Sequence, residues 1–161
     1  MIEIYTDGSC HTNYNIGAWV AILLVANDKI VLKGDAQNTT HNRMELLAVI
    51  KAIEFADENF RNASLAVYTD SQYVARIPER KEKLKRNLFR TKRGTPLQNF
   101  DLVQVIIGQI ETRTIEIIKV KAHQQPEIGS LNAPVNYNSE VDKLARQMVR
   151  EAVKHDQQGY K

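Results

Sequence analysis

Cysteine is almost absent from this 161-residue chain, and long apolar runs are missing altogether. The single cysteine, Cys10, cannot form a disulfide within the chain. No apolar run approaches the ~20 residues that a membrane-spanning helix needs. The first residues contain neither a basic leader nor the apolar core of a signal peptide. We therefore expect a cytoplasmic protein that works in a reducing setting, away from membranes.

Internal repeats, low-complexity tracts and interdomain linkers are also missing. A chain of this length with 43% hydrophobic residues suits one domain with a sizeable core. We expect this single domain to cover residues 1–155 and a frayed polar tail to follow at 156–161. The least regular stretch, residues 123–138, holds two prolines and one glycine and predicts a long loop.

Charge is distributed unevenly along the chain. The formal net charge is only +3, yet residues 76–93 carry nine Lys or Arg against two Glu. The remainder is therefore net acidic. A concentrated basic element on an acidic body points to a polyanionic partner, although such a segment can also be a solvated helix face.

Hydrophobic periodicity predicts the order strand, strand, strand, helix, strand, basic helical segment, helix, strand, helix. Period-two or continuous apolar patterns mark the strands at 2–7, 17–26, 29–36, 65–70 and 114–122, and helical spacing marks the helices from 42, over 97–110 and from 139. Asn27 and Asp28 suit a hairpin turn between the second and third strands. This order predicts an α/β fold with helices on a mixed sheet, in which the first and fourth strands run parallel.

The first long helix has several possible N-terminal caps. Thr39, Thr40 and Asn42 are all suitable, and Asn42 with Glu45 matches the spacing of a capping box. Capping or compensation of the helix dipole is therefore one possible role for Glu45.

The tripeptide Tyr-Thr-Asp occurs twice, ending at Asp7 and at Asp70. If the two strands lie side by side and parallel, both aspartates project from the same face near corresponding strand ends. Two carboxylates so close must share a proton or bind a cation. Oxygen ligands without a His/Cys cluster favour Mg²⁺ or Mn²⁺ over Zn²⁺. A lone aspartate at either place could instead cap a strand end.

Five stretches in this order resemble the motifs of type 1 ribonuclease H, the bacterial ribonuclease HI group: IYTDGS, TTHNRMELLAVIKAIE, VYTDSQYV, VKAH and NSEVDKLAR. The resemblance runs from about residue 2 to about residue 152. It implies the ribonuclease H-like fold, with a five-stranded mixed sheet whose first three strands are antiparallel and whose last two run parallel to the first. It also implies an endonuclease that hydrolyses the RNA strand of an RNA/DNA hybrid.

The resemblance also assigns the site residues. Asp7, Glu45, Asp70 and Asp142 fall on the family's metal-binding carboxylates, which implies two Mg²⁺ ions, with Mn²⁺ possible, and products that carry a 5′-phosphate and a 3′-hydroxyl. His123 falls on a family histidine that assists proton transfer or product release.

Substrate contacts follow from the same family positions. The implied partner is an RNA/DNA hybrid, bound by a protein that is expected to be a monomer. The basic protrusion, residues 76–96, would bind the DNA strand. Short polar residues would contact the sugars, base edges and one phosphate, and basic residues the DNA backbone: Asn13, Thr40, Asn42, Gln72 and Asn138, with Lys83, Lys85 and Arg86.

Three departures from the family pattern stand out. The turn after Cys10 retains only Gly17 of a glycine-rich segment, the loop between His123 and Asp142 is longer than usual, and Ala122 replaces a glycine. The first strand begins at the start of the chain, so we expect no N-terminal hybrid-binding domain and low processivity.

Two other functions compete with this interpretation. One is a DNA nuclease of the integrase or resolvase type on the same fold, which would space its acids differently. The other is a non-catalytic nucleic-acid-binding module, which would gain nothing from four acids beside a phosphate backbone. A fold shared by several nuclease classes does not name the substrate.

Overall fold

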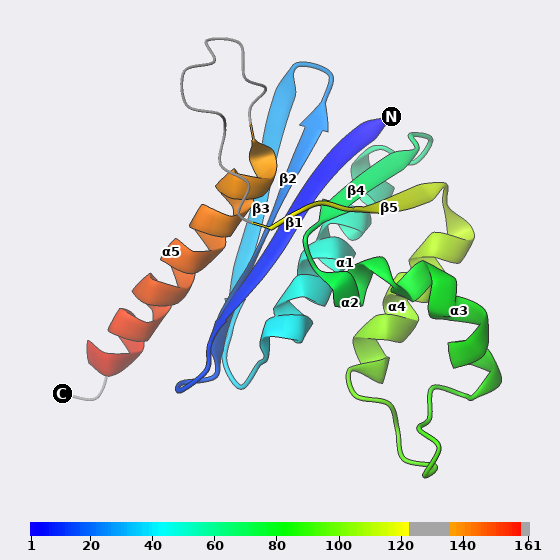
Figure 1. Ribbon diagram of the computed structural model, residues 1–161. Helices are drawn as coiled ribbons and strands as arrows, with labels where there is room; N and C mark the ends of the chain where they lie inside the picture. The colour runs from blue at the N-terminus through cyan, green and yellow to red at the C-terminus, as the bar shows by residue number, and fades with distance from the viewer. Residues whose placement is uncertain (123–135, 159–161) are drawn as a thin grey trace.

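The computed structural model describes residues 1–122 and 136–158, and its centre is a five-stranded sheet (Figure 1). The strand order is β3-β2-β1-β4-β5. β2 pairs antiparallel with β1 and β3, whereas β4 runs parallel to β1 and to β5. The predicted mixed sheet is confirmed. Its strands are β1 (Ile2–His11), β2 (Ile16–Val25), β3 (Asp28–Ala36), β4 (Leu65–Thr69) and β5 (Ile115–Lys119).

Helices cover both faces of this sheet, as predicted. Among the described helices, α5 is the one on one face of the sheet, and the other four lie on the opposite side, where α3 and α4 pack against other helices (Figure 1). None of the helices in the described ranges is both long enough and apolar enough to cross a membrane. The helices are α1 (His41–Asn59), α2 (Gln72–Ala75), α3 (Ile77–Arg86), α4 (Phe100–Thr112) and α5 (Tyr137–Gln158).

Successive side chains of β1 point to opposite faces of the sheet, so the hydrophobic core has two parts. Ile2 and Ile4 face the helices α1 to α4 and join the larger hydrophobic cluster. Tyr5 faces the other way and packs against the smaller cluster, which contains Val141 and Ala145 of α5. Complete burial of a large apolar side chain contributes about 1.5–3 kcal/mol. β1 is therefore fixed from both sides, which holds its last residues in place.

The structure corrects two predicted boundaries near the site. Val25 pairs with Asp28, so the hairpin turn is Ala26–Asn27, one residue earlier than predicted, and Ala26 has a φ of 54°. The cap of α1 is Thr40, whose hydroxyl accepts from the Arg43 N–H at 3.3 Å. Glu45 therefore lies in the second turn, and its buried side chain does not form the predicted capping box.

The basic segment is less regular than its sequence suggested. α3 ends at Arg86, and Leu88 and Phe89 follow with φ values of 53° and 55°, a conformation that a helix cannot contain. A bridge between Arg90 and Pro96 then closes a short hairpin. α4 begins at Phe100, three residues later than predicted.

The other ends differ as well. β5 stops at Lys119, short of the predicted residue 122. α5 begins at Tyr137, two residues before the predicted start, and continues to Gln158. Residues 156–158, predicted to be part of a frayed tail, are therefore helical.

Gly8 allows α1 to lie directly against β1. A Cβ atom at this position would be 2.4 Å from the backbone nitrogen of Glu45 and 2.5 Å from the carbonyl carbon of Met44. Both atoms belong to helix backbone, so neither can turn aside as a side chain would. The missing side chain at Gly8 thus sets the distance between Asp7 and Glu45.

We expect Gly8→Ala to lower the free energy of unfolding by about 1–3 kcal/mol, because the added methyl group must displace α1. The matched control is Gly108→Ala in α4, where a Cβ meets nothing within 4 Å. That change should raise stability by about 0.5–1 kcal/mol, since glycine weakens a helix interior. Urea unfolding of both variants measures the difference. Equal effects would contradict the close approach of α1 to β1.

Candidate active site

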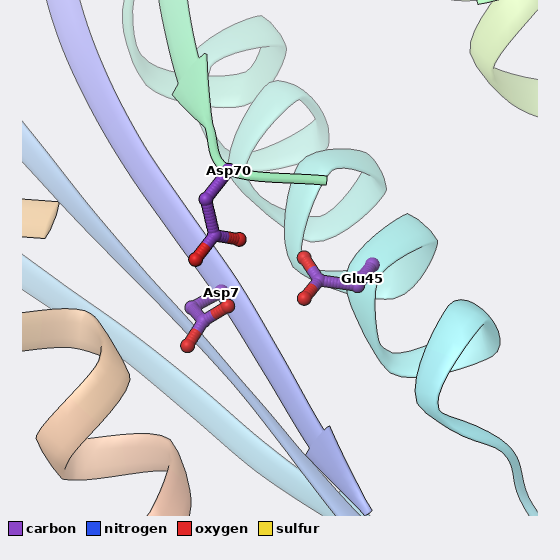
Figure 2. Close-up of side chains that lie close together, drawn as sticks. All are labelled: Asp7, Glu45 and Asp70. Atoms are coloured by element: carbon purple, nitrogen blue, oxygen red, sulfur yellow. The ribbon is translucent and has the colours of Figure 1, made fainter. Parts of the chain in front are cut away.

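Three carboxylates from three separate elements converge beside the end of β4 (Figure 2). Asp7 lies in β1, Asp70 directly follows β4, and Glu45 reaches in from α1. One oxygen of each lies within 4.8 Å of one from each of the others. The predicted proximity of the two repeated aspartates is confirmed, and Glu45 joins them.

Strand register explains why the aspartates meet. Thr6 pairs with Thr69 in the parallel ladder, so the next residues, Asp7 and Asp70, emerge side by side. Two residues earlier on the same face, the rings of Tyr5 and Tyr68 stack with centroids 4.8 Å apart and planes 13° apart. The repeated tripeptide thus supplies a ring pair and a carboxylate pair in the same register.

Burial changes the protonation of this cluster. Asp7 is 3% exposed and Glu45 is 1% exposed. Burial, with repulsion from Glu45 and Asp70, raises the pKa of Asp7 to about 10. Burial and then the charge of Asp70 raise the pKa of Glu45 to about 8, against the opposing effect of hydrogen bonds. Without a cation, the cluster therefore holds protons at neutral pH.

The donor atoms suit a hard divalent cation. All are carboxylate oxygens, the ligands that Mg²⁺ and Mn²⁺ prefer. The Oε2 atom of Glu45 is buried without a hydrogen-bond partner. A buried acceptor of this kind is costly, and a cation would satisfy it.

Asp142 lies close to the three-acid cluster without being one of its members. Its carboxylate projects from α5, is 23% exposed, and lies 3.2 Å from Nε of Arg146. Its negative charge contributes to the raised pKa values of Asp7 and Glu45. The predicted fourth acid is therefore within electrostatic reach of the others, in the second turn of α5.

His41 contacts a residue of the acid cluster, although it was not among the predicted site residues. Its Nε2 atom lies 3.3 Å from Oε1 of Glu45, four residues later on α1. The i,i+4 spacing was the available signal, since such residues share a helix face. His123, the histidine that was predicted, lies outside the described residues.

The predicted substrate residues divide into exposed and buried ones. Asn13, Thr40, Asn42 and Gln72 are exposed. Asn138 is only 8% exposed, and its Nδ2 atom donates to the carbonyl of Lys121 at 3.2 Å, so its amide already has a structural partner.

The predicted basic residues lie in the last turn of α3. Lys83, Lys85 and Arg86 are all exposed. Lys85 forms an ion pair with Glu111 of α4 at 3.0 Å, which connects the basic helix to the body of the domain. Part of the basic charge is thus balanced within the protein.

We expect Asp7→Asn to stabilise the metal-free protein, and increasingly so as pH rises. Folding raises the pKa values of Asp7 and Glu45 above their unfolded values near 4. The folded state then binds more protons than the unfolded state, so wild-type stability is lost as pH rises toward about 8 and about 10. The amide introduced by Asp7→Asn cannot ionise, so the variant loses less stability than the wild type as pH rises.

Urea unfolding in EDTA at pH 5 and pH 8 tests this expectation. The gain from Asp7→Asn should be about 1 kcal/mol or more at pH 8 and smaller at pH 5. Asp35→Asn, at an exposed position on β3, is the control and should change stability by less than about 0.5 kcal/mol. A gain that is independent of pH would show that the cluster is not strained by its charges.

The comparisons with known proteins agree on one family. The family model for RNase H matches residues 1–150. A ribonuclease H of Caldicellulosiruptor saccharolyticus is 34% identical over 152 residues, which cover 93% of this chain and 97% of that protein. A ribonuclease H of Dechloromonas aromatica is 39% identical over 137 residues, covering 84% and 90% of the two chains.

Solved structures show the same fold. LC11-RNase H1 in complex with RNA/DNA hybrid has a TM-score of 0.67 at 16% identity, with 95% of this chain and 99% of that chain covered. A prototype foamy virus protease-reverse transcriptase has a TM-score of 0.72 at 26% identity, with 92% of this chain and 20% of that chain covered. With its carboxylate cluster and its near full-length relatives, the chain belongs to the ribonuclease H family of nucleases.

Proposed function

We propose that this protein is an endonuclease that hydrolyses the RNA strand of RNA/DNA hybrids and leaves 5′-phosphate and 3′-hydroxyl ends. The observation that carries the proposal is the buried cluster of Asp7, Glu45 and Asp70. Family membership supports it, as does the hybrid bound to a protein of the same fold.

Divalent cations, two Mg²⁺ or alternatively Mn²⁺, would supply an activated water and stabilise the leaving 3′ oxygen. Asp7, Glu45 and Asp70 would hold them, with Asp142 as the ligand from α5. The orphaned Oε2 atom of Glu45 supports this assignment. The buried acids would give up their protons on binding, so affinity for the cation should rise with pH.

The residues around the cluster would recognise the hybrid. The 2′-hydroxyls of the RNA strand lie in a shallow minor groove, where short polar side chains reach them. Asn13, Asn42 and Gln72 are exposed and would read sugars or base edges. Thr40 would contact a phosphate through its hydroxyl, which also caps α1.

Two further residues complete this proposal. The buried Asn138 would contribute chiefly by fixing the start of α5 to Lys121. His123 would transfer a proton or assist release of the product.

The substitution Asp70→Asn tests catalysis. It removes one charge from the ligand set, so Mg²⁺-dependent cleavage should fall by at least about three orders of magnitude, as expected when charge stabilisation at a reacting phosphate is lost. Hybrid binding should change less than about threefold, because the basic segment is untouched. Gel assays with labelled RNA/DNA hybrid, RNA duplex and DNA duplex, with and without Mg²⁺, measure both quantities.

Asp28→Asn is the matched control and should cleave like the wild type, because Asp28 pairs with Val25 at the end of β2, whereas Asp7 pairs with Val20 further along that strand. Cleavage of DNA duplex would favour a DNA nuclease, and binding without any cleavage a passive module. Retained Mg²⁺-dependent activity in Asp70→Asn would remove Asp70 from the mechanism.

The basic protrusion, residues 76–96, would bind the DNA strand beside the cut. Each phosphate neutralised adds about 0.9 to the slope of log affinity against log salt for B-form DNA. Lys83→Gln should therefore lower the slope by roughly 1. Lys85→Gln should lower it less, because the ammonium group is already paired with Glu111. Both slopes can be measured by fluorescence anisotropy at several salt concentrations in a catalytically inactive background. Equal slopes for Lys83→Gln and Lys85→Gln would contradict the weaker role expected for Lys85.

A further inference from the structure

The turn that connects β1 to β2, residues 12–15, is tied to the segment that precedes α1. The N–H of Asn15 donates to the carbonyl of His11 at 2.8 Å and closes the turn. The carbonyl of Asn15 accepts from the N–H of Thr39 at 3.0 Å. The turn that contains Asn13 is thereby joined to the segment that leads into Thr40, another residue proposed to contact the hybrid.

The same turn is bound to the far end of the chain. Nε2 of Gln157, in the last turn of α5, donates to the hydroxyl of Tyr14 at 2.8 Å. The His11 ring supports Tyr14, with centroids 4.9 Å apart and planes 52° apart. Nδ1 of His11 is buried without a hydrogen-bond partner, although the residue as a whole is only half-buried.

The end of α5 packs only partly against the sheet. The last buried residue of α5 is Val149. Beyond it, a cleft of about 540 Å³ with both polar and apolar lining lies between α5 and the strands β2 and β3. Its lining includes Ile16, Lys33, Asp35, Met148, Ala152 and His155. A specific hydrogen bond joins the last turn of α5 to the turn between β1 and β2.

We infer that Tyr14 and Gln157 are positioning residues for substrate recognition: the end of α5 fixes the 12–15 turn so that Asn13 is presented to the RNA strand. This inference rests on the proposed function. The turn lacks the glycine-rich sequence, and among the described residues of the turn Asn15 alone has a positive φ, of 52°. A turn fixed before binding loses less conformational entropy when the hybrid is bound, which lowers KM without altering the hydrolytic step.

The test compares Tyr14→Phe, Gln157→Ala and the double variant in steady-state cleavage of RNA/DNA hybrid. Phenylalanine keeps the ring contact with His11 and removes the hydroxyl. A net hydrogen bond contributes about 0.5–1.5 kcal/mol. Each single change should therefore raise KM roughly two- to tenfold at constant kcat, and the double variant should match the singles rather than multiply them.

Gln157→Glu should keep KM near the wild-type value, because the phenol of Tyr14 can donate to a carboxylate. The added negative charge opposes hybrid binding, so a retained KM cannot be attributed to charge. Urea unfolding of each variant should remain within about 0.5 kcal/mol of wild type, since the bond is exposed. A matched control, Gln147→Ala, removes an amide that pairs with Glu151 on the same helix and should leave KM unchanged.

Three outcomes would overturn the inference. The first is an unchanged KM in both single variants. The second is a raised KM in Tyr14→Phe with an unchanged KM in Gln157→Ala, which would indicate that the Tyr14 hydroxyl itself contacts the nucleic acid. The third is a fall in kcat that parallels a loss of stability. Failure of the wild-type protein to cleave the hybrid would instead contradict the proposed function, so the two can be told apart.

Discussion

Repulsion among buried carboxylates is the constraint on which the rest of this structure depends. Asp7 and Glu45 are almost completely buried, and Asp70 shares their site. Burial raises the pKa values of Asp7 and Glu45, and the charge of Asp70 raises both further. Such a cluster persists only because the surrounding fold holds it. Two packed layers, a fixed strand register and a glycine contact each contribute to that restraint.

Much of this arrangement could be predicted from the sequence, because it depends on local patterns. The repeated Tyr-Thr-Asp predicted two acids side by side on parallel strands, and the parallel pairing of Thr6 with Thr69 confirms this. The predicted end of the first strand at residue 7 was wrong, because β1 continues to His11. Helical periodicity located α1, and the family motifs added Glu45 and Asp142. The strands and helices followed because each buries one face with the period of its own geometry.

The remaining features depend on contacts between distant parts of the chain, which single-sequence patterns do not encode. Thr40 rather than Asn42 caps α1, and Glu45 is buried in the acid cluster instead of closing a capping box. Two contacts join residues far apart in the sequence: the ion pair between Lys85 and Glu111, and the hydrogen bond between Gln157 and Tyr14. The ends of helices also differed from their predicted positions where residues with a positive φ, such as Leu88, interrupt a sequence of helical composition.

The position of α5 in the sequence determines the order in which the acidic residues are made during synthesis. Asp7, Glu45 and Asp70 all lie in the first half of the chain, whereas Asp142 and Gln157 belong to the last helix. Among the described helices, α5 is the one that packs on its face of the sheet. A ribosome delivers the chain from its N-terminus, so the nascent protein has Asp7, Glu45 and Asp70 before α5 emerges. The same helix then packs against the sheet and brings the charge of Asp142 close to the three-acid cluster.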